Sequence, residues 1–201
     1  MRYDPEKHHR RSIRLSGYDY SQAGAYFVTI CTQNRQCLFG EIVDGEMRLN
    51  NAGQMVQLVW AELAQHYAGV DIDGFVVMPN HIHGIVILTS VGAGPGACPA
   101  KGRPQGVKGQ PQGVAPTMSL PDVVHRFKSL TTARYRRGVM ERGWPGFCSR
   151  LWQHNYYEHV IRAGDELDRI RRYIEDNPRM WEMDRENPAA QKTKGKESWL
   201  V

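Results

Sequence analysis

Two short apolar segments, 72–78 and 81–88, meet at Pro79-Asn80 and constrain the fold more than any other part of the chain. Valine and isoleucine in both segments favour strands, and the proline and asparagine between them favour a corner. Residues 26–32 are β-branched and aromatic and predict another strand. The chain is therefore expected to build a sheet from short strands.

Hairpin and helix signals complete the predicted architecture. Segments 37–43 and 46–49 are predicted strands joined by Asp44-Gly45, a hairpin turn in which both positions need positive φ. Helices are predicted where apolar residues recur at helical spacing between capping residues and proline. They cover 52–66 after Asn50 or Asn51 as N-cap, 119–137, and 165–177 between Asp165 as N-cap and Pro178, while 150–161 is predicted as strand or irregular. Hairpins mixed with helices indicate an α+β fold, with helices packed on an antiparallel sheet.

Glycine and proline dominate the chain from Ser90 to Thr117. Such a segment cannot bury enough apolar surface to offset its ordering entropy, so it is predicted to be a flexible surface insertion. The alternative, a linker between two domains, is disfavoured because the basic stretch after it is too short to form its own core. Three parts are therefore expected: a basic segment 1–17, a single domain 18–188 interrupted at 90–117, and a polar tail 189–201.

Composition narrows the class of protein. The net charge is +5 and the pI about 9.1, which is compatible with a polyanionic partner. Four cysteines are scattered without a C-x-x-C pair, which favours reduced thiols and a cytoplasmic location over a disulfide framework. No apolar run is long enough to span a membrane, and no apolar stretch follows the basic N-terminus as in a signal peptide.

His81 and His83 form the first candidate site. Side chains alternate along a strand, so both imidazoles project from one face while Ile82 projects from the other. Two imidazoles at this spacing can reach one metal ion. H-x-H also occurs by chance, but here it interrupts a strongly apolar strand, where uncommitted polar side chains would be costly.

Two further groups could carry function. Tyr173 and Asn177 lie one helical turn apart on one face, although the residues alone favour a packing tyrosine and a helix-terminal asparagine. Aromatic and basic side chains that could stack on bases or contact phosphates lie on the helix 119–137 and in the segment after it. They are Arg126, Lys128, Arg134, Arg137, Tyr156 and Arg162, with Tyr157 and His159 in the same aromatic and basic group, whereas Trp152 is expected to pack in the core.

Four motifs occur in an order that resembles the REP-associated tyrosine transposases, a single-tyrosine branch of the HUH endonucleases. They are M-P-N-H-I-H-G after an apolar strand, K-S-L in a basic helix, L-W-Q-x-x-Y-Y-E-H-V-I-R, and R-R-Y-I-E-D-N-P. The resemblance as a whole extends from about Tyr18 to Pro188. The resemblance implies a ferredoxin-like fold with the histidine pair on a central strand and the tyrosine helix beside it.

The resemblance also implies roles for individual residues. Tyr173 matches the nucleophile, and His81, His83 and Asn177 match the ligands of Mg²⁺ or Mn²⁺. The implied enzyme nicks single-stranded or hairpin (REP-like) DNA and transfers the strand through a 5′-phosphotyrosine. Lys128 is a candidate helper for proton transfer, and both a monomer and a homodimer remain open.

Two other functions are compatible with these residues. A domesticated relative could recognise structured single-stranded DNA without transposing, although the intact Tyr173 and histidine pair favour retained cleavage. A metal-dependent hydrolase using the histidines alone would need further carboxylate ligands and a base that activates water. Neither lies close to His81 and His83 in the sequence.

Overall fold

The computed structural model describes residues 17–89 and 118–190. The expected insertion at 90–117, nearly all of the basic segment 1–17 and most of the tail 189–201 lie outside these residues. The described residues form a four-stranded antiparallel sheet in the order β4-β5-β1-β6. Its strands are β1 (Gly24–Cys31), β4 (Val70–Val77), β5 (His81–Leu88) and β6 (Tyr157–Ile161).

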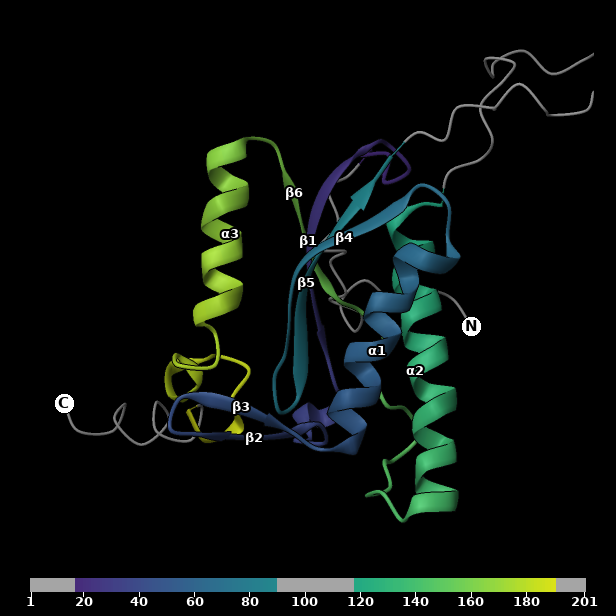
Figure 1. The fold of residues 1–201 in the computed structure, drawn as a ribbon, viewed down its shortest axis with the longest axis vertical. Coiled ribbons are helices and arrows are strands. Elements are labelled where there is room, and N and C mark those ends of the chain that lie inside the picture. Colours follow the sequence, from purple (N-terminus) through teal and green to yellow (C-terminus); the bar gives the residue numbers. More distant parts are fainter. Residues whose placement is uncertain (1–16, 90–117, 191–201) are drawn as a thin grey trace, which may run out of the picture.

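Three helices and a separate hairpin complete the described fold (Figure 1). The helices are α1 (Asn51–His66), α2 (Leu120–Arg142) and α3 (Gly164–Asp176), and the hairpin pairs β2 (Gly40–Val43) with β3 (Glu46–Leu49). Two short 3-10 turns, η1 (Gln33–Arg35) and η2 (Trp181–Met183), lie in the connections. None of the helices in the described ranges has the length and apolar character needed to cross a membrane.

The order of elements confirms the predicted α+β, ferredoxin-like fold. Without the β2–β3 hairpin and α3, the chain runs strand–helix–strand–strand–helix–strand, through β1, α1, β4, β5, α2 and β6. The two inner strands, β5 and β1, are paired along their whole length, from Gly24 opposite Leu88 to Cys31 opposite His81. This pairing places the start of β5 beside the end of β1, at one end of the sheet.

The two faces of the sheet are covered by different helices (Figure 1). On one face, Ile82 and Val86 join the core cluster that includes Trp60 of α1 and Phe127 of α2. On the other face, α3 covers a smaller cluster made by Phe27, Ile85, Ile161 and Ile174. Because side chains alternate along β5, the odd-numbered residues His81, His83 and Ile85 all face α3.

Gly84 explains one feature of the M-P-N-H-I-H-G motif. Gly84 directly follows His83 in β5, and it faces α1, on the opposite side of the sheet from the two histidines. A Cβ atom at Gly84 would lie 2.4 Å from Cζ2 of Trp60, which is too close for any side chain. The indole of Trp60, stacked on Phe75 at 4.6 Å between centroids, therefore occupies the space that a side chain would need.

Most local predictions are confirmed, with corrections at element ends. The strand predicted over 37–43 begins only at Gly40. Asn50 is the N-cap of α1, its side chain accepting from the Gly53 N–H, and Asp44 and Gly45 have φ of 54° and 76° as the hairpin turn requires. Asp165 is not the N-cap of α3, because the helix starts one residue earlier after an extended Ala163, which leaves Asp165 in the first turn. The predicted α2 extends further than expected, to a left-handed Gly143.

Candidate metal and tyrosine site

His81 and His83 lie side by side at the start of β5, as their spacing predicted. Both are buried, with 0% and 3% of their surface exposed. Their Nε2 atoms are 3.1 Å apart and face each other. Burial lowers the pKa of His81 to about 3, and burial followed by the neighbouring His81 lowers the pKa of His83 well below its ordinary value. Both rings are therefore neutral at physiological pH and can offer lone pairs.

Asn80 determines which nitrogen of His81 carries its proton. The side-chain nitrogen of Asn80 donates to the backbone carbonyls of Arg35, at 3.1 Å, and Glu186, at 2.8 Å. Its oxygen must therefore face His81, where it accepts from Nδ1 at 2.8 Å. With the proton on Nδ1, the Nε2 lone pair of His81 points toward His83. Asn80 is fully buried and was not recognised as functional from the sequence.

Thr29 performs a related task for His83. Its hydroxyl lies 2.8 Å from Nδ1 of His83, directly across the β1–β5 pair. A hydroxyl can donate or accept, so Thr29 is able to stabilise either tautomer of His83. The lone pair of His83 Nε2 is thus available to an incoming cation without loss of the hydrogen bond at Nδ1.

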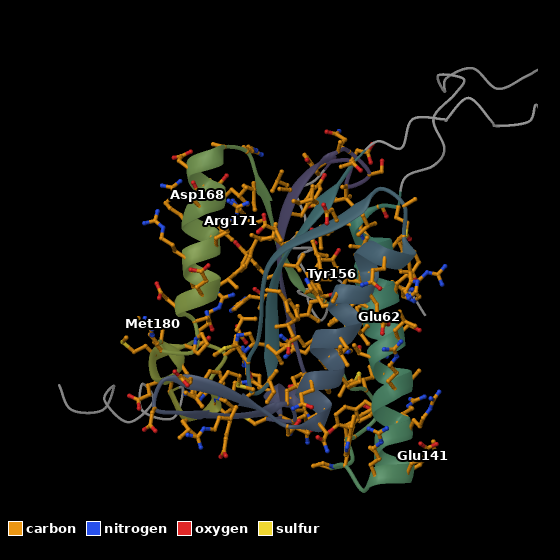
Figure 2. All side chains as sticks on the ribbon, in the orientation of Figure 1. Glu62, Glu141, Tyr156, Asp168, Arg171 and Met180 are labelled. Atoms are coloured by element: carbon orange, nitrogen blue, oxygen red, sulfur yellow. The ribbon has the colours of Figure 1, made fainter. Side chains whose placement is uncertain are left out.

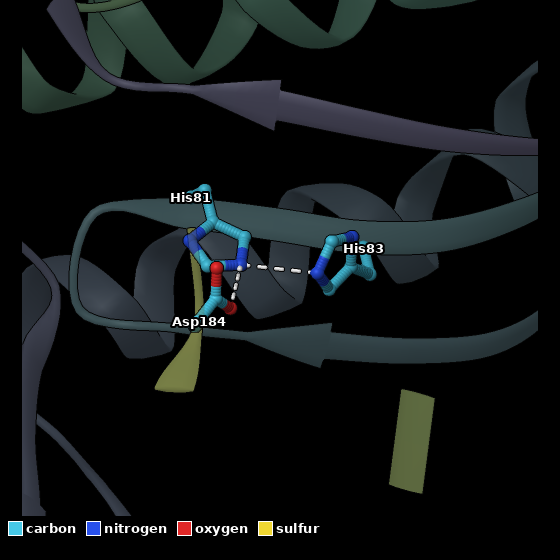
Figure 3. Close-up of side chains that lie close together, drawn as sticks. All are labelled: His81, His83 and Asp184. Carbon is cyan, nitrogen blue, oxygen red and sulfur yellow. Dashed lines mark hydrogen bonds and ion pairs between the residues drawn. The ribbon is translucent and has the colours of Figure 1, made fainter. Parts of the chain in front are cut away.

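Asp184 adds a carboxylate to the histidine pair. Its Oδ2 lies 3.6 Å from Nε2 of His81, and one ligand atom from each of His81, His83 and Asp184 lies within 4.8 Å of the others (Figure 3). Burial raises the pKa of Asp184. Asp184 was not recognised from the sequence, because it follows η2, about one hundred residues after the histidines.

An ion pair fixes the segment that carries Asp184. Glu186 accepts from Nε of Arg35 at 2.7 Å, and Glu186 is the same residue whose carbonyl binds Asn80. Burial alone would raise the pKa of Glu186, but the hydrogen bond and charge of Arg35 outweigh it and lower that pKa. The loop that carries Asp184 is thereby held against β5 and η1.

Tyr173 lies beside the cluster, on the face of α3 that meets the sheet. Its Oη is 3.5 Å from Nε2 of His83, and its ring packs edge-to-face on Phe27 with centroids 5.9 Å apart. The residue is nevertheless 51% exposed, so part of the side chain is reachable from solvent. Burial and then the charge of Asp184 raise the pKa of Tyr173, which keeps the phenol protonated.

Asn177, the other residue predicted on this helix, is the C-cap of α3. It is 3% exposed, and its Oδ1 is buried and accepts no hydrogen bond from the described part of the chain. A buried amide oxygen without a partner is costly. A cation bound to this oxygen would remove that cost, and the ligand role of Asn177 stays a prediction.

The residues predicted to contact DNA are placed differently from one another. Arg126, Arg137 and Arg162 are exposed. Arg134 forms a bidentate ion pair with Glu62 of α1, with N···O distances of 2.8 and 2.6 Å. Its charge is therefore partly neutralised by α1.

Lys128 and Tyr156 belong to a groove of about 1090 Å³ between α2 and the segment that precedes β6. Nζ of Lys128 donates to the carbonyls of Gln153, His154 and Asn155 at 2.9–3.3 Å. It also lies 5.3 Å from the centre of the Tyr156 ring, and Tyr156 is only 9% exposed.

Tyr156 and Trp152, which both line this groove, lie away from α3. Tyr156 lies on the α1–α2 side of the sheet, whereas Arg171 lies on α3 (Figure 2). The buried Trp152 donates to Thr131 at 2.8 Å, which confirms that it packs.

The fold and site define a ferredoxin-like domain with a buried His-His-Asp cluster and an accessible tyrosine at its edge. No protein-family model matches the chain. An uncharacterized protein of Haemophilus influenzae is 38% identical over 184 residues, which cover 91% of this chain and 96% of that protein. The chain belongs to the same family as this Haemophilus influenzae protein.

Two solved structures have a similar arrangement of elements. One is a REP-associated tyrosine transposase bound to a REP hairpin, with a TM-score of 0.47 and 20% identity, covering 82% of this chain and 73% of that chain. The other is a putative transposase from Deinococcus radiodurans, with a TM-score of 0.41 and 17% identity, covering 81% of this chain and 97% of that chain.

Proposed function

We propose that this protein is a metal-dependent tyrosine transposase that nicks single-stranded or hairpin DNA and rejoins it through a 5′-phosphotyrosine. The observation that carries the proposal is the position of Tyr173, whose hydroxyl lies 3.5 Å from His83 in the His81–His83–Asp184 cluster. The four sequence motifs support the same assignment. Each of these side chains comes from a motif that resembles the transposases, except Asp184.

The donor atoms suit a divalent cation such as Mg²⁺ or Mn²⁺. Two imidazole nitrogens and one carboxylate oxygen converge. Asn177, at the C-terminal end of the helix that carries Tyr173, has a buried amide oxygen without a hydrogen-bond partner in the described part of the chain. Such a cation, held by His81, His83, Asp184 and Asn177, would act as a Lewis acid on the scissile phosphate. Asn80 and Thr29 keep the two imidazoles oriented for this task.

Tyr173 would supply the nucleophile. Its Oη forms a bond to phosphorus while the bond from phosphorus to the 3′ oxygen breaks, the phenol losing one proton and the departing 3′ oxygen gaining one. Because a phenol is far more acidic than a sugar hydroxyl, the phosphotyrosine ester remains reactive toward a 3′-hydroxyl. Strand transfer then needs no new energy source, whereas hydrolysis by water would break the phosphotyrosine ester without rejoining the DNA.

A covalent-adduct assay tests the proposal. Wild-type protein incubated with a labelled single-stranded or hairpin oligonucleotide should form a species that survives denaturing electrophoresis, and Tyr173→Phe should abolish it while leaving DNA binding nearly unchanged. Tyr157→Phe is a matched control, since it removes the hydroxyl of a second exposed tyrosine on the same face. EDTA should stop adduct formation and Mn²⁺ or Mg²⁺ restore it. An adduct that persists in Tyr173→Phe would assign the nucleophile to another residue.

The same assay distinguishes the proposed enzyme from the alternative, a DNA-binding protein that does not cleave. Such a protein would bind the hairpin and give no adduct at any metal concentration. His81→Ala and His83→Ala would then leave its affinity unchanged.

A further inference from the structure

An exposed aromatic residue lies on the same face of the sheet as the histidine cluster. Strand alternation places Tyr157, His159 and Ile161 of the edge strand β6 on the face that α3 covers. Ile161 is buried in the cluster under α3, and His159 is held by Glu166 at 2.7 Å. Tyr157 is 41% exposed. Its ring is therefore available to a planar ligand at the open end of this face.

Strand register brings Tyr157 close to the site. Thr29 of β1 pairs with Tyr157 on one side and with His83 on the other, so the three residues form one row across three strands. With neighbouring strands about 4.8 Å apart, the backbones of Tyr157 and His83 are about 10 Å apart across the sheet. Phe27 lies between the aromatic rings, with its centroid 6.3 Å from Tyr157 and 5.9 Å from Tyr173. Tyr157 and Tyr173 thus flank the same ring.

A positive charge accompanies this aromatic ring. The guanidinium of Arg185 lies 5.9 Å from the ring centroid of Tyr157. Its side chain is 76% exposed, although Nε also donates to Glu186 at 3.1 Å. Arg185 directly follows Asp184 in the chain, so the loop that brings the carboxylate to His81 also brings this guanidinium to Tyr157.

We propose that Tyr157 and Arg185 form a nucleotide subsite beside the scissile phosphate, Tyr157 stacking on a base of single-stranded DNA and Arg185 contacting the adjoining phosphate. This inference rests on the proposed function and names residues that would hold its substrate. An aromatic ring beside a basic side chain is the usual platform for a single strand, because every base has a face that can stack. Of the two adjacent tyrosines predicted from the sequence as stacking candidates, Tyr156 is almost entirely buried and Tyr157 is exposed.

Affinity measurements test the two contacts separately. They use a Tyr173→Phe background, which cannot cleave, and the anisotropy of a fluorescent oligothymidylate. Tyr157→Ala should weaken binding roughly 5- to 150-fold with an unchanged salt slope, and Tyr157→Phe should bind like the background protein. Arg185→Gln should flatten the slope of log K against log salt by about 0.7. Arg179→Gln, an equally exposed arginine with no contact to the Tyr157 ring among the described residues, should leave the slope unchanged.

Photo-crosslinking identifies the contact directly. An oligonucleotide carrying 5-bromodeoxyuridine should crosslink to Tyr157 within the tryptic peptide 151–162, which also contains Tyr156 as an internal control. If wild-type protein forms the covalent adduct but the crosslink lies elsewhere and Tyr157→Ala binds normally, the subsite is wrong and the proposed function stands. If wild-type protein neither binds DNA nor forms the adduct, both are wrong.

Discussion

Replacing Asn80 by alanine should remove the hydrogen bond that orients the His81 ring and should also destabilise the fold. Asn80 makes three hydrogen bonds in a fully buried position: two from its amide nitrogen to the carbonyls of Arg35 and Glu186, and one that its oxygen accepts from His81. At about 1 kcal/mol of net stabilisation each, their loss should lower the free energy of unfolding by about 3 kcal/mol. A domain of ordinary stability, about 5–15 kcal/mol, would remain folded.

The same substitution should also lower the affinity for metal, for a reason separate from the loss of stability. Without the acceptor at position 80, His81 is no longer held with its proton on Nδ1, and the Nε2 lone pair is no longer fixed toward His83. Loss of such an outer partner typically reduces metal affinity about 10- to 100-fold. Titration of Mn²⁺ into the folded variant by calorimetry, alongside urea denaturation, measures both effects.

Asn80→Asp separates the two effects because it keeps the acceptor for His81 and removes both donors. Its carboxylate would face the carbonyl oxygens of Arg35 and Glu186, so stability should fall at least as far as in Asn80→Ala. Affinity for Mn²⁺ should stay near that of the wild type. Equal losses of affinity in Asn80→Ala and Asn80→Asp would refute the tautomer argument and leave Asn80 with a purely structural role.

Three further predictions follow from other parts of the fold. Gly84→Ala should destabilise the protein by about 1–3 kcal/mol in urea denaturation, because its methyl group would overlap Trp60, whereas an unchanged midpoint would show that the indole moves aside. Arg126→Gln combined with Arg137→Gln should flatten the salt dependence of single-strand binding by about 1.4, and an unchanged slope would mean that this helix face does not contact DNA. Hydrogen bonds from Arg171 lower the pKa of Asp73 below 3.8, so this pair should stabilise the fold above about pH 4 and lose that contribution as the pH falls through the lower, folded value. Asp73→Asn should therefore unfold with a weaker acid dependence than the wild type, and identical acid profiles would contradict this.

The sheet was predictable because its signals are local. The β-branched runs, the Asp44-Gly45 turn and the apolar helix faces each depend on neighbours a few residues away, and the structure confirms them. The N-terminus of α3 was placed wrongly because Asp165 and Glu166 both suit a first turn, and composition alone does not say which residue begins it. The pairing of β6 with β1 could not be predicted, because segment 150–161 carries no clear alternation.

Only the part of the site that depends on neighbouring residues could be predicted from the sequence. His81 and His83 share a strand, so their alignment follows from spacing alone, and this part of the prediction is confirmed. Asp184 enters through a loop about one hundred residues later, and Asn80 acts through backbone carbonyls that have no sequence signature. The roles of Tyr173 and Asn177 came from the resemblance rather than from their spacing, and they stay predictions until cleavage is measured.

Because this cluster is buried in the folded protein, metal binding should be measurable as an increase in the free energy of unfolding. A carboxylate whose pKa burial raises lies beside two buried imidazoles, and an amide oxygen on the neighbouring helix lacks a hydrogen-bond partner among the described residues. A buried carboxylate and a buried unpaired oxygen are both costly without a cation. Manganese at one hundred times its dissociation constant should therefore stabilise the fold by about 2.7 kcal/mol, or roughly 5–11 °C in melting temperature for a chain of this size.

Two variants identify the third ligand in that experiment. Asp184→Asn keeps the shape of the side chain and removes its charge, so the thermal shift with Mn²⁺ should shrink. Asn177→Ala should reduce it further only if the amide oxygen also binds the cation. A full shift in Asp184→Asn together with its loss in Asn177→Ala would show that the helix residue inferred from the resemblance is the third ligand. In that case the carboxylate 3.6 Å from His81 would be a neighbour of the metal rather than a ligand.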